Sequence, residues 1–222
     1  MLAHRPGGAL IRLYLIRHAQ SVGNAESRLQ GQRDYPLTPD GERQADALAA
    51  RLRDAGLAAV YASPLNRTMA TAQQIAAACD LPIAQEPRLV EYDFGVAVSG
   101  LTWEAIRAEH PDVIEALMRN DSDFPRYPGE EGRAAFSERV HAAFTEVRNR
   151  HWADRAVAVV THAGPIVVHL MHVLGRKYSR PAPFAIDNAS LTTIVCDEPG
   201  SFSGVVVTGI NDRCHLDPPT KS

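Results

Sequence analysis

The chain has 222 residues, of which 45% are hydrophobic and 22% charged, and its formal net charge at pH 7 is −3. This length suits a single α/β domain covering residues 1–222, and the composition is that of a globular protein, not a disordered or fibrous one. The mild negative charge argues against a nucleic-acid-binding protein, and no apolar run approaches the ~20 residues that a membrane-spanning helix needs.

Cysteine usage indicates the compartment. Cys79, Cys196 and Cys214 are an odd number without a C-x-x-C pair, so they predict neither a disulfide framework nor a zinc site. Buried free thiols are expected, and these suit a reducing environment. The apolar run at residues 9–16 lacks the cleavage site of a signal peptide. We therefore predict a cytoplasmic protein.

The first half of the chain alternates strands and helices. Residues 10–16 form an apolar run of strand length, and Thr38-Pro39 offers a helix N-cap followed by proline at the first helical position. The helix that follows has apolar residues at 45, 48, 49 and 52, and Gly56 is a plausible stop. Residues 57–62 predict a second strand, after which Ser63-Pro64 repeats the cap and proline of another helix. This order favours a parallel sheet.

The second half continues the pattern after an irregular segment. Residues 92–131 are interpreted as a short helical excursion over the sheet edge, a candidate lid. An amphipathic helix runs from Phe136 to near Trp152, residues 156–160 form a buried strand, and Gly164-Pro165 opens the next helix. Residues 190–196 and 203–210 are two final strands, and 217–222 is a loose tail. The predicted fold is a three-layer α/β/α sandwich with a mostly parallel central sheet.

Basic side chains follow three of these strands. Arg17 and His18 come after the first strand, Arg67 lies in the first turn of the helix after the second, and His162 follows the strand at 156–160. In open parallel sheets, ligands bind beyond the carboxyl ends of the strands. The helices that begin there also direct free backbone N–H groups toward the same edge. A phosphate-sized dianion is the natural ligand of such a site.

Seven short segments, in this order, resemble the histidine phosphatase superfamily. The similarity is to its first branch, which contains cofactor-independent phosphatases and cofactor-dependent phosphoglycerate mutases, and it runs from about residue 12 to residue 216. The segments are Leu15-Ile-Arg-His-Ala-Gln-Ser-Val-Gly-Asn24, Leu29-Gln-Gly-Gln-Arg-Asp-Tyr-Pro-Leu-Thr38 with Gly41, Ser63-Pro-Leu-Asn-Arg-Thr68 with Thr71-Ala72, Leu89-Val-Glu-Tyr-Asp-Phe-Gly95, Val160-Thr-His-Ala-Gly164, Asn188-Ala-Ser-Leu191, and Asn211-Asp212 with His215-Leu216.

The resemblance implies a phosphoglycerate mutase-like fold and a metal-independent reaction without a cofactor. It assigns His18 as the nucleophile, Glu91 as the proton donor, and Arg17, Arg67 and His162 as the groups that clamp the phosphoryl oxygens. It further implies substrate contacts from Asn24, Gln30, Gly31 and the Ala163-Gly164 backbone. A neutral imidazole is a competent nucleophile near pH 7, and a phosphohistidine divides one hard displacement into two easier ones.

Some residues have rival interpretations. Asp93 is the main competitor of Glu91 as the acid, and Ala19 stands where the family most often has glycine, which fits only if its φ is negative. His169 and His172 lie three apart on a helix, but no third metal ligand appears at a suitable spacing, so surface histidines are expected. The lid residues Arg107, Arg119, Arg126 and Tyr127 either bind a second anionic group of the substrate, such as that of a sugar phosphate or phosphoglycerate, or belong to a solvated charged helix face.

The expected activity is hydrolysis of small phosphorylated metabolites, with neither nucleic acid nor membrane as a partner. A phosphoglycerate mutase is the first alternative, although the short stretch between Glu91 and His162 and the form Gln30-Gly-Gln32 resemble the phosphatases. The second alternative is a non-catalytic protein that binds phosphorylated ligands. A homodimer is possible.

Overall fold

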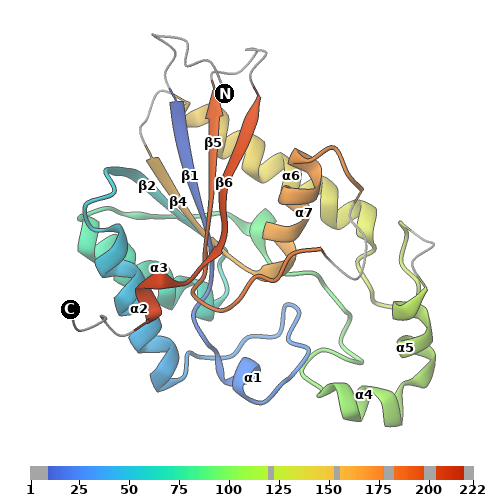
Figure 1. Ribbon diagram of the computed structural model, residues 1–222. Coiled ribbons are helices and arrows are strands. Elements are labelled where there is room, and N and C mark those ends of the chain that lie inside the picture. Colours follow the sequence, from blue (N-terminus) through green and yellow to red (C-terminus); the bar gives the residue numbers. More distant parts are fainter. Residues whose placement is uncertain (1–9, 120–122, 153–155, 178–182, 198–203, 218–222) are drawn as a thin grey trace.

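The computed structural model describes residues 10–119, 123–152, 156–177, 183–197 and 204–217. A six-stranded sheet in the order β3-β2-β4-β1-β5-β6 forms the centre of the molecule (Figure 1). Neighbouring strands from β3 to β1 are parallel, whereas β5 runs antiparallel to both β1 and β6. The prediction of a mostly parallel sheet is confirmed. The strands are β1 Leu10–Arg17, β2 Leu57–Ala62, β3 Ile83–Gln85, β4 Ala156–Thr161, β5 Leu191–Asp197 and β6 Val205–Asp212.

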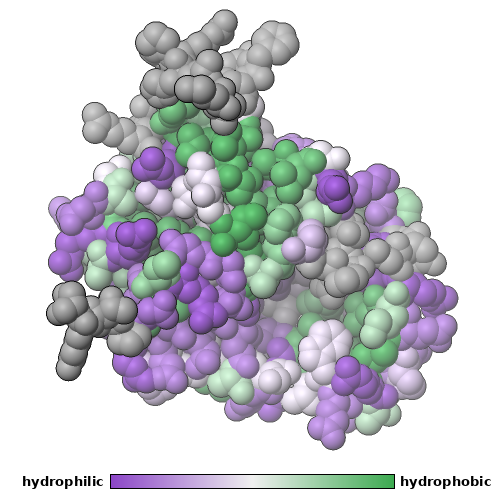
Figure 2. Space-filling view, viewed as in Figure 1, coloured by the Kyte–Doolittle hydropathy of each residue, from purple (hydrophilic) through white to green (hydrophobic). Residues whose placement is uncertain are grey.

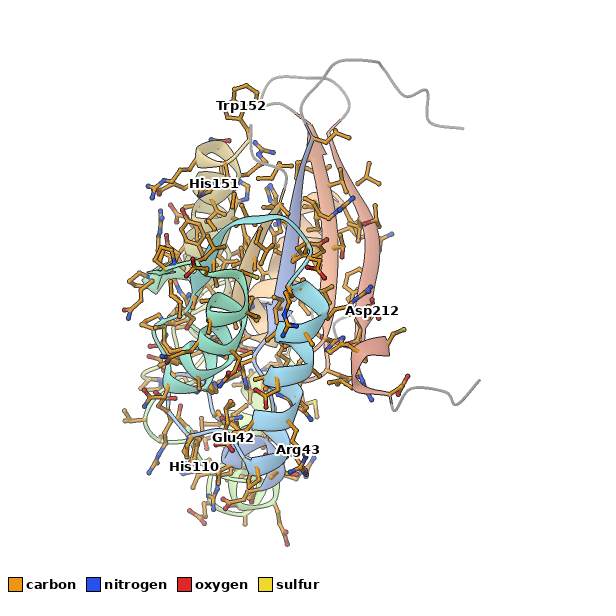
Figure 3. The ribbon with its side chains drawn as sticks, turned by 90° about the vertical axis from the view of Figure 1, so that its left-hand side faces the viewer. Glu42, Arg43, His110, His151, Trp152 and Asp212 are labelled. Atoms are coloured by element: carbon orange, nitrogen blue, oxygen red, sulfur yellow. The ribbon has the colours of Figure 1, made fainter. Side chains whose placement is uncertain are left out.

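Helices cover both faces of the sheet, as the predicted α/β/α sandwich requires. Helices α2 and α3 lie on one face and α6 and α7 on the other (Figure 1). The side view in Figure 3 places His151 and Trp152, at the end of α6, at the opposite end of the molecule from Glu42 in the first turn of α2. The helices are α1 Val22–Ala25, α2 Pro39–Leu52, α3 Asn66–Cys79, α4 Trp103–Glu109, α5 Pro111–Met118, α6 Arg133–Arg150 and α7 Ala163–Val173, with 3₁₀ helices η1 Pro87–Leu89 and η2 Cys214–Leu216.

Two clusters of buried hydrophobic residues form the core, and the central strand β1 contributes side chains to both. Leu13 and Leu15 pack in the cluster that contains Phe136 of α6, whereas Ile16 packs in the cluster that contains Leu48 of α2. All five side chains are at most 1% exposed. At about 25 cal/mol per Å² of buried apolar surface, such side chains supply most of the drive for folding. The rigid sheet they create holds the loop that follows β1.

Of the two helix N-caps predicted in the first half of the chain, the structure has Thr38 but not Ser63. Thr38 caps α2 as expected, because its side chain accepts a hydrogen bond from the Gly41 N–H at 3.0 Å. Gly41 is required there, since a Cβ would lie 2.0 Å from the carbonyl oxygen of Gln20. Ser63, however, caps nothing: α3 begins at Asn66, with Leu65 as its N-cap. The prediction of a Ser63 cap is wrong, and Ser63 is completely buried instead.

The 92–131 segment contains the two short helices α4 and α5, which confirms the predicted helical excursion (Figure 1). Arg126 does not belong to a solvated face and is not available to bind a second anion. Its guanidinium pairs with Glu130, and both side chains are at most 7% exposed. The Glu130 carboxylate also accepts a hydrogen bond from the Tyr92 hydroxyl at 2.6 Å. Arg126 therefore fastens the excursion to the chain that follows Glu91.

Four smaller expectations differ from the structure or reach beyond the residues that it describes. His169 is not a surface histidine, because it is 8% exposed and stacks on Phe144 with ring centroids 4.2 Å apart. Cys214 is exposed, not buried. The helix predicted to open at Gly164 begins one residue earlier, at Ala163. The predicted tail lies outside the described residues from position 218 onward.

The surface of the described chain is mixed. Figure 2 shows an apolar area over β5 and β6, where Val206 and Ile210 are 39% and 38% exposed, and a largely hydrophilic surface around α1 and α2. No helix among the described residues is long and apolar enough to cross a membrane. Within the same residues, no group of three or more His, Cys, Asp or Glu side chains is arranged to hold a metal ion.

Candidate active site

The candidate site lies where β1 and β4 end side by side. Arg17 is the register partner of Thr161, and the His18 N–H donates to the Thr161 carbonyl at 2.9 Å. This pairing brings His18 and His162 together, with ring centroids 5.2 Å apart and planes inclined by 66°. The sequence separation of the two histidines is large, so the parallel pairing of their strands is what creates the site.

His18 is held in one tautomer. Its Nδ1 lies 2.7 Å from the carbonyl oxygen of Ala19, so Nδ1 carries the proton and Nε2 keeps its lone pair. The ring is 3% exposed. Burial, together with the positive charges of Arg67 and Arg17, lowers the pKa of His18 well below 6.5. The imidazole is therefore neutral at neutral pH.

The backbone around His18 is fixed from three sides. Its carbonyl oxygen accepts hydrogen bonds from the Asn188 side chain at 3.1 Å and from the Ala189 N–H at 3.2 Å. The next N–H, that of Ala19, donates to the Thr71 hydroxyl at 3.0 Å. Ala19 is absent from the described residues with positive φ, so the expectation that alanine fits here is confirmed. Neither the histidine nor its neighbours can rotate freely.

Two arginines flank the histidines. Arg17 donates from Nη1 to the carbonyl oxygen of Ile186 at 2.7 Å. Arg67 is 1% exposed, and its two terminal nitrogens donate to the carbonyl oxygens of Arg33 and Gly31 at 2.9 and 2.7 Å. Within the described chain, the Nε atoms of both arginines are buried without a partner. Burial lowers the pKa of each guanidinium, while the negative charge of Glu91 opposes that shift.

His162 is oriented by Ser63, which directly follows the neighbouring parallel strand β2. Its Nε2 lies 2.9 Å from the Ser63 hydroxyl, and both side chains are at most 1% exposed. Its Nδ1 is buried without a partner among the described residues. Burial and the charges of Arg67 and Arg17 lower the pKa of His162 well below 6.5. His162 is thus a neutral hydrogen-bonding group and not a cation.

Glu91 approaches the site from the segment after η1. One carboxylate oxygen accepts a hydrogen bond from the Gly164 N–H at 3.1 Å, and the other accepts one from its neighbour Tyr92 N–H at 2.8 Å. Gly164 leaves room for this contact, since a Cβ would lie 2.0 Å from Glu91 Oε1. Asp93, the rival acid, instead accepts from the Gly95 N–H at 2.8 Å and shapes its own turn.

The predicted substrate contacts lie in the loop after β1 and at the start of α7. Asn24 accepts hydrogen bonds at its amide oxygen from the Asn188 side chain at 3.0 Å and from the Ser21 N–H at 3.1 Å, which leaves its NH₂ group as a donor. Gln30 is 8% exposed and contacts the Ser21 hydroxyl at 2.8 Å. Gly31 has a φ of +53° and directs its carbonyl at Arg67. Ala163 and Gly164 form the first turn of α7.

The sequence interpretation missed several supporting residues. Ser63 was expected to cap a helix, and Asn188 and Thr71 appeared only as parts of family segments. Thr161 donates to the carbonyl oxygen of Leu89 at 2.7 Å, and Arg139 of α6 donates to that of Glu91 at 3.0 Å. Thr161 directly precedes His162, and Ser63 directly follows a predicted strand, so both positions offer a usable signal. Nothing in the sequence distinguishes Arg139 from the other charged residues of its helix.

Comparisons with known proteins identify the family of the chain. The model of the histidine phosphatase superfamily (branch 1) matches residues 13–207. The chain is 34% identical over 207 residues to "Phosphoserine phosphatase 1" of Hydrogenobacter thermophilus, covering 93% of this chain and 95% of that protein. It is also 34% identical over 215 residues to "Probable phosphoglycerate mutase GpmB" of an Enterobacter species, covering 95% and 97%.

A solved structure extends the comparison to the fold. "Bacillus stearothermophilus YhfR" superimposes with a TM-score of 0.83 at 27% identity, covering 93% of this chain and all of that one. The chain belongs to the histidine phosphatase superfamily, branch 1, as its sequence segments suggested. It is thus an enzyme of that family, and its relatives include a named phosphatase and a named probable mutase. The resemblance inferred from short motifs is confirmed.

Proposed function

We propose that the protein hydrolyses phosphate monoesters of small metabolites through a phosphohistidine on His18, with Glu91 as the proton donor and without a metal ion. The observation that carries this proposal is the tautomer of His18. Because Nδ1 donates to the Ala19 carbonyl, Nε2 presents a lone pair between Arg17, Arg67 and His162. A buried, neutral and oriented imidazole is what nucleophilic attack on phosphorus requires.

The basic groups supply the charge stabilisation. A phosphoryl group in transfer spreads negative charge over three oxygens, and fixed donors in a buried site stabilise it strongly. The buried Nε atoms of Arg17 and Arg67 are two such donors. The buried Nδ1 of His162 is a third such donor in the tautomer in which the Ser63 hydroxyl donates to Nε2, and our proposal assigns that tautomer. Each charge-assisted hydrogen bond contributes roughly 1.5 to 3 kcal/mol.

The reaction then has two balanced steps. Nε2 of His18 attacks phosphorus, the bond to the ester oxygen breaks, and Glu91 gives its proton to the leaving alkoxide. In the second step Glu91 takes a proton from water, whose oxygen attacks the phosphohistidine and releases inorganic phosphate. The contact of Glu91 with Gly164, two residues after His162, supports this role, whereas Asp93 is engaged in its own turn.

The substrate is proposed to be a small phosphorylated alcohol. The phosphatase relative is named for phosphoserine, and the buried pairing of Arg126 with Glu130 removes one of the lid arginines that could select a second anionic group. We also propose that the protein acts in the cytoplasm, where its free cysteines would stay reduced.

The test is to trap the intermediate. Brief incubation with ³²P-labelled substrate followed by denaturation should give an acid-labile, base-stable phosphoenzyme in the wild type and none in His18→Ala. Hydrolysis of p-nitrophenyl phosphate should persist in EDTA. Substantial activity in His18→Ala would contradict the nucleophile assignment, and loss of activity in EDTA that added metal restores would contradict a metal-independent reaction.

A phosphoglycerate mutase is the second candidate, favoured by the 34% identity to a probable mutase. A mutase must retain its phosphoryl group long enough to return it to a bound product, whereas a phosphatase loses it to water. Incubating the enzyme with 3-phosphoglycerate and 2,3-bisphosphoglycerate separates the two. Net formation of 2-phosphoglycerate faster than release of phosphate would establish the mutase.

A further inference from the structure

We propose that Arg139 and Glu131 form a positioning pair that holds Glu91 in the orientation needed for proton donation. The inference rests on the proposed role of Glu91 and extends it to two residues that contact neither the nucleophile nor the clamping arginines. Arg139 lies on α6, and Glu131 lies just before that helix, at the end of the 92–131 excursion.

Arg139 grips the backbone that carries the acid. Its Nη1 donates to the carbonyl oxygens of Arg88 and Val90 at 2.7 and 2.8 Å, and its Nη2 donates to that of Glu91 at 3.0 Å. Three carbonyls within four consecutive residues are therefore bound by one side chain. The planar guanidinium fixes them in a single arrangement, which a lysine ammonium, as a compact point charge, would not reproduce.

Glu131 fixes the arginine in turn. Its carboxylate pairs with the Arg139 guanidinium, including an Nη2 to Oε2 contact at 2.9 Å, and their side chains are only 15% and 19% exposed. The guanidinium also lies over the Phe136 ring, 4.8 Å from its centroid. At this exposure the pair is screened less than a surface ion pair. The Arg139 guanidinium is thus held at its edge by the Glu131 carboxylate and on its face by the Phe136 ring.

Glu131 also reaches the other side of the acid. Its N–H donates to the Asp93 carbonyl oxygen at 3.0 Å, and its carboxylate accepts from the Asp93 N–H at 3.2 Å. The adjacent Glu130 accepts from the Tyr92 hydroxyl. Tyr92 and Asp93, the two residues after the acid, are therefore bound by Glu130 and Glu131, whereas Glu91 itself is bound by Arg139. Helix α6 and the excursion jointly set the position of Glu91.

This placement predicts a selective effect on chemistry. A general acid must lie within hydrogen-bond reach of the leaving oxygen, and a misplacement of about 1 Å can reduce the rate about 100-fold. Phenolate needs a proton in order to leave, whereas p-nitrophenolate leaves readily without one. Loosening Glu91 should therefore slow phenyl phosphate far more than p-nitrophenyl phosphate, although the two substrates have almost the same shape.

The experiment compares kcat/KM for these two esters in Arg139→Met, Arg139→Lys, Glu131→Gln and wild type. Arg150→Met is the matched control, because Arg150 lies on the same helix and pairs at the surface with Glu146 at 2.6 Å. For Arg139→Met we expect about a 100-fold loss on phenyl phosphate and less than about 5-fold on p-nitrophenyl phosphate. Arg139→Lys and Glu131→Gln should show smaller selective losses, and Arg150→Met none.

The proposal would be overturned if the variants lost kcat/KM equally on the two esters, which is what a merely structural role would produce. It would also be overturned if they lost none. If Arg139→Met does not fold, the two milder variants decide in the same way. Glu91→Gln, measured in parallel, separates this inference from the proposed mechanism. A selective loss in Glu91→Gln without one in the Arg139 and Glu131 variants refutes the positioning pair alone. A Glu91→Gln variant without selectivity refutes the acid itself, and the pair with it.

Discussion

Replacing Gly164 by alanine should damage catalysis while leaving the fold intact. The added Cβ would lie 2.0 Å from Glu91 Oε1 and 3.1 Å from the Phe136 ring, so the carboxylate must move. The helix itself tolerates the change, since Gly164 is the second residue of α7 and alanine has the higher helix propensity. The substitution therefore displaces the Glu91 carboxylate and leaves the backbone of α7 unchanged.

The expected magnitude follows from what the carboxylate does. The shift breaks the 3.1 Å hydrogen bond from the Gly164 N–H and takes the acid out of reach of the leaving oxygen. General acid catalysis typically contributes 10²- to 10⁴-fold, so we expect a loss of about 100-fold in kcat/KM for phenyl phosphate. That loss corresponds to about 2.7 kcal/mol in activation free energy. Stability should change by less than about 1 kcal/mol, because the gain in helix propensity offsets the crowding.

Steady-state kinetics and thermal unfolding of the same preparation test this prediction. Gly209→Ala is the matched control, because a Cβ at Gly209 on β6 meets nothing within 4 Å and should change neither quantity. Wild-type kcat/KM on phenyl phosphate in a folded Gly164→Ala protein would refute the assignment of Glu91 as the proton donor. A loss of activity that merely follows a loss of folded protein would refute the claim that the helix tolerates alanine.

Four further outcomes are expected. Ser63→Ala removes the hydroxyl that orients His162, so kcat/KM should fall about 10-fold, as for one lost hydrogen bond; unchanged kinetics would contradict this. The acid limb of the kcat/KM profile, corrected for substrate ionisation, should lie well below pH 6.5, because the pKa of His18 is lowered by burial; a limb at 6.5 would show a solvated histidine. Burial lowers the pKa of His169 to about 3, so the unfolded state binds a proton that the folded state excludes, and the free energy of unfolding falls with acid below about pH 6.5. His169→Phe should reduce that slope by up to about 1.4 kcal/mol per pH unit in urea unfolding between pH 7 and 5; parallel curves would contradict it. Thr38→Ala should cost about 1 kcal/mol and lower Tm by about 2 to 4 °C in calorimetry without changing kcat/KM, whereas an unchanged Tm would mean that the cap is unimportant.

Much of the fold follows from local patterns in the sequence. The apolar run of β1, the stripe of α2 and the Thr38 cap each depend on residues a few positions apart, and the structure has them as expected. β3 was not foreseen, because Ile83–Gln85 is only three residues long and has one partly buried side chain and two exposed ones. So short a strand has no readable period and forms only because it pairs with β2.

In the site, too, the features that depend on local patterns could be predicted, whereas contacts between distant residues could not. His18 and His162 could be placed together because parallel strands end at one edge of a sheet. Ser63 was misassigned, because Ser-Pro is a good local cap signal, whereas its actual partner is a buried ring 99 residues further along the chain. Arg139 was invisible for a related reason. Its three carbonyl partners belong to a segment about 50 residues away. Because every residue has a backbone carbonyl, the sequence does not reveal which of them accepts a hydrogen bond.

The place of β1 in the sheet affects how the protein becomes active during synthesis. Its two neighbours are β4 and β5, which begin at Ala156 and Leu191, so the strand that leads into His18 has no partner in the sheet until most of the chain has left the ribosome. Such distant pairings make folding slow and leave strand edges exposed to aggregation. The site residues that are synthesised first, Arg17 and His18, thus wait longest for the strands that fix their position. A nascent or truncated chain that ends before β4 should therefore have no phosphatase activity, however well α2 and α3 have formed.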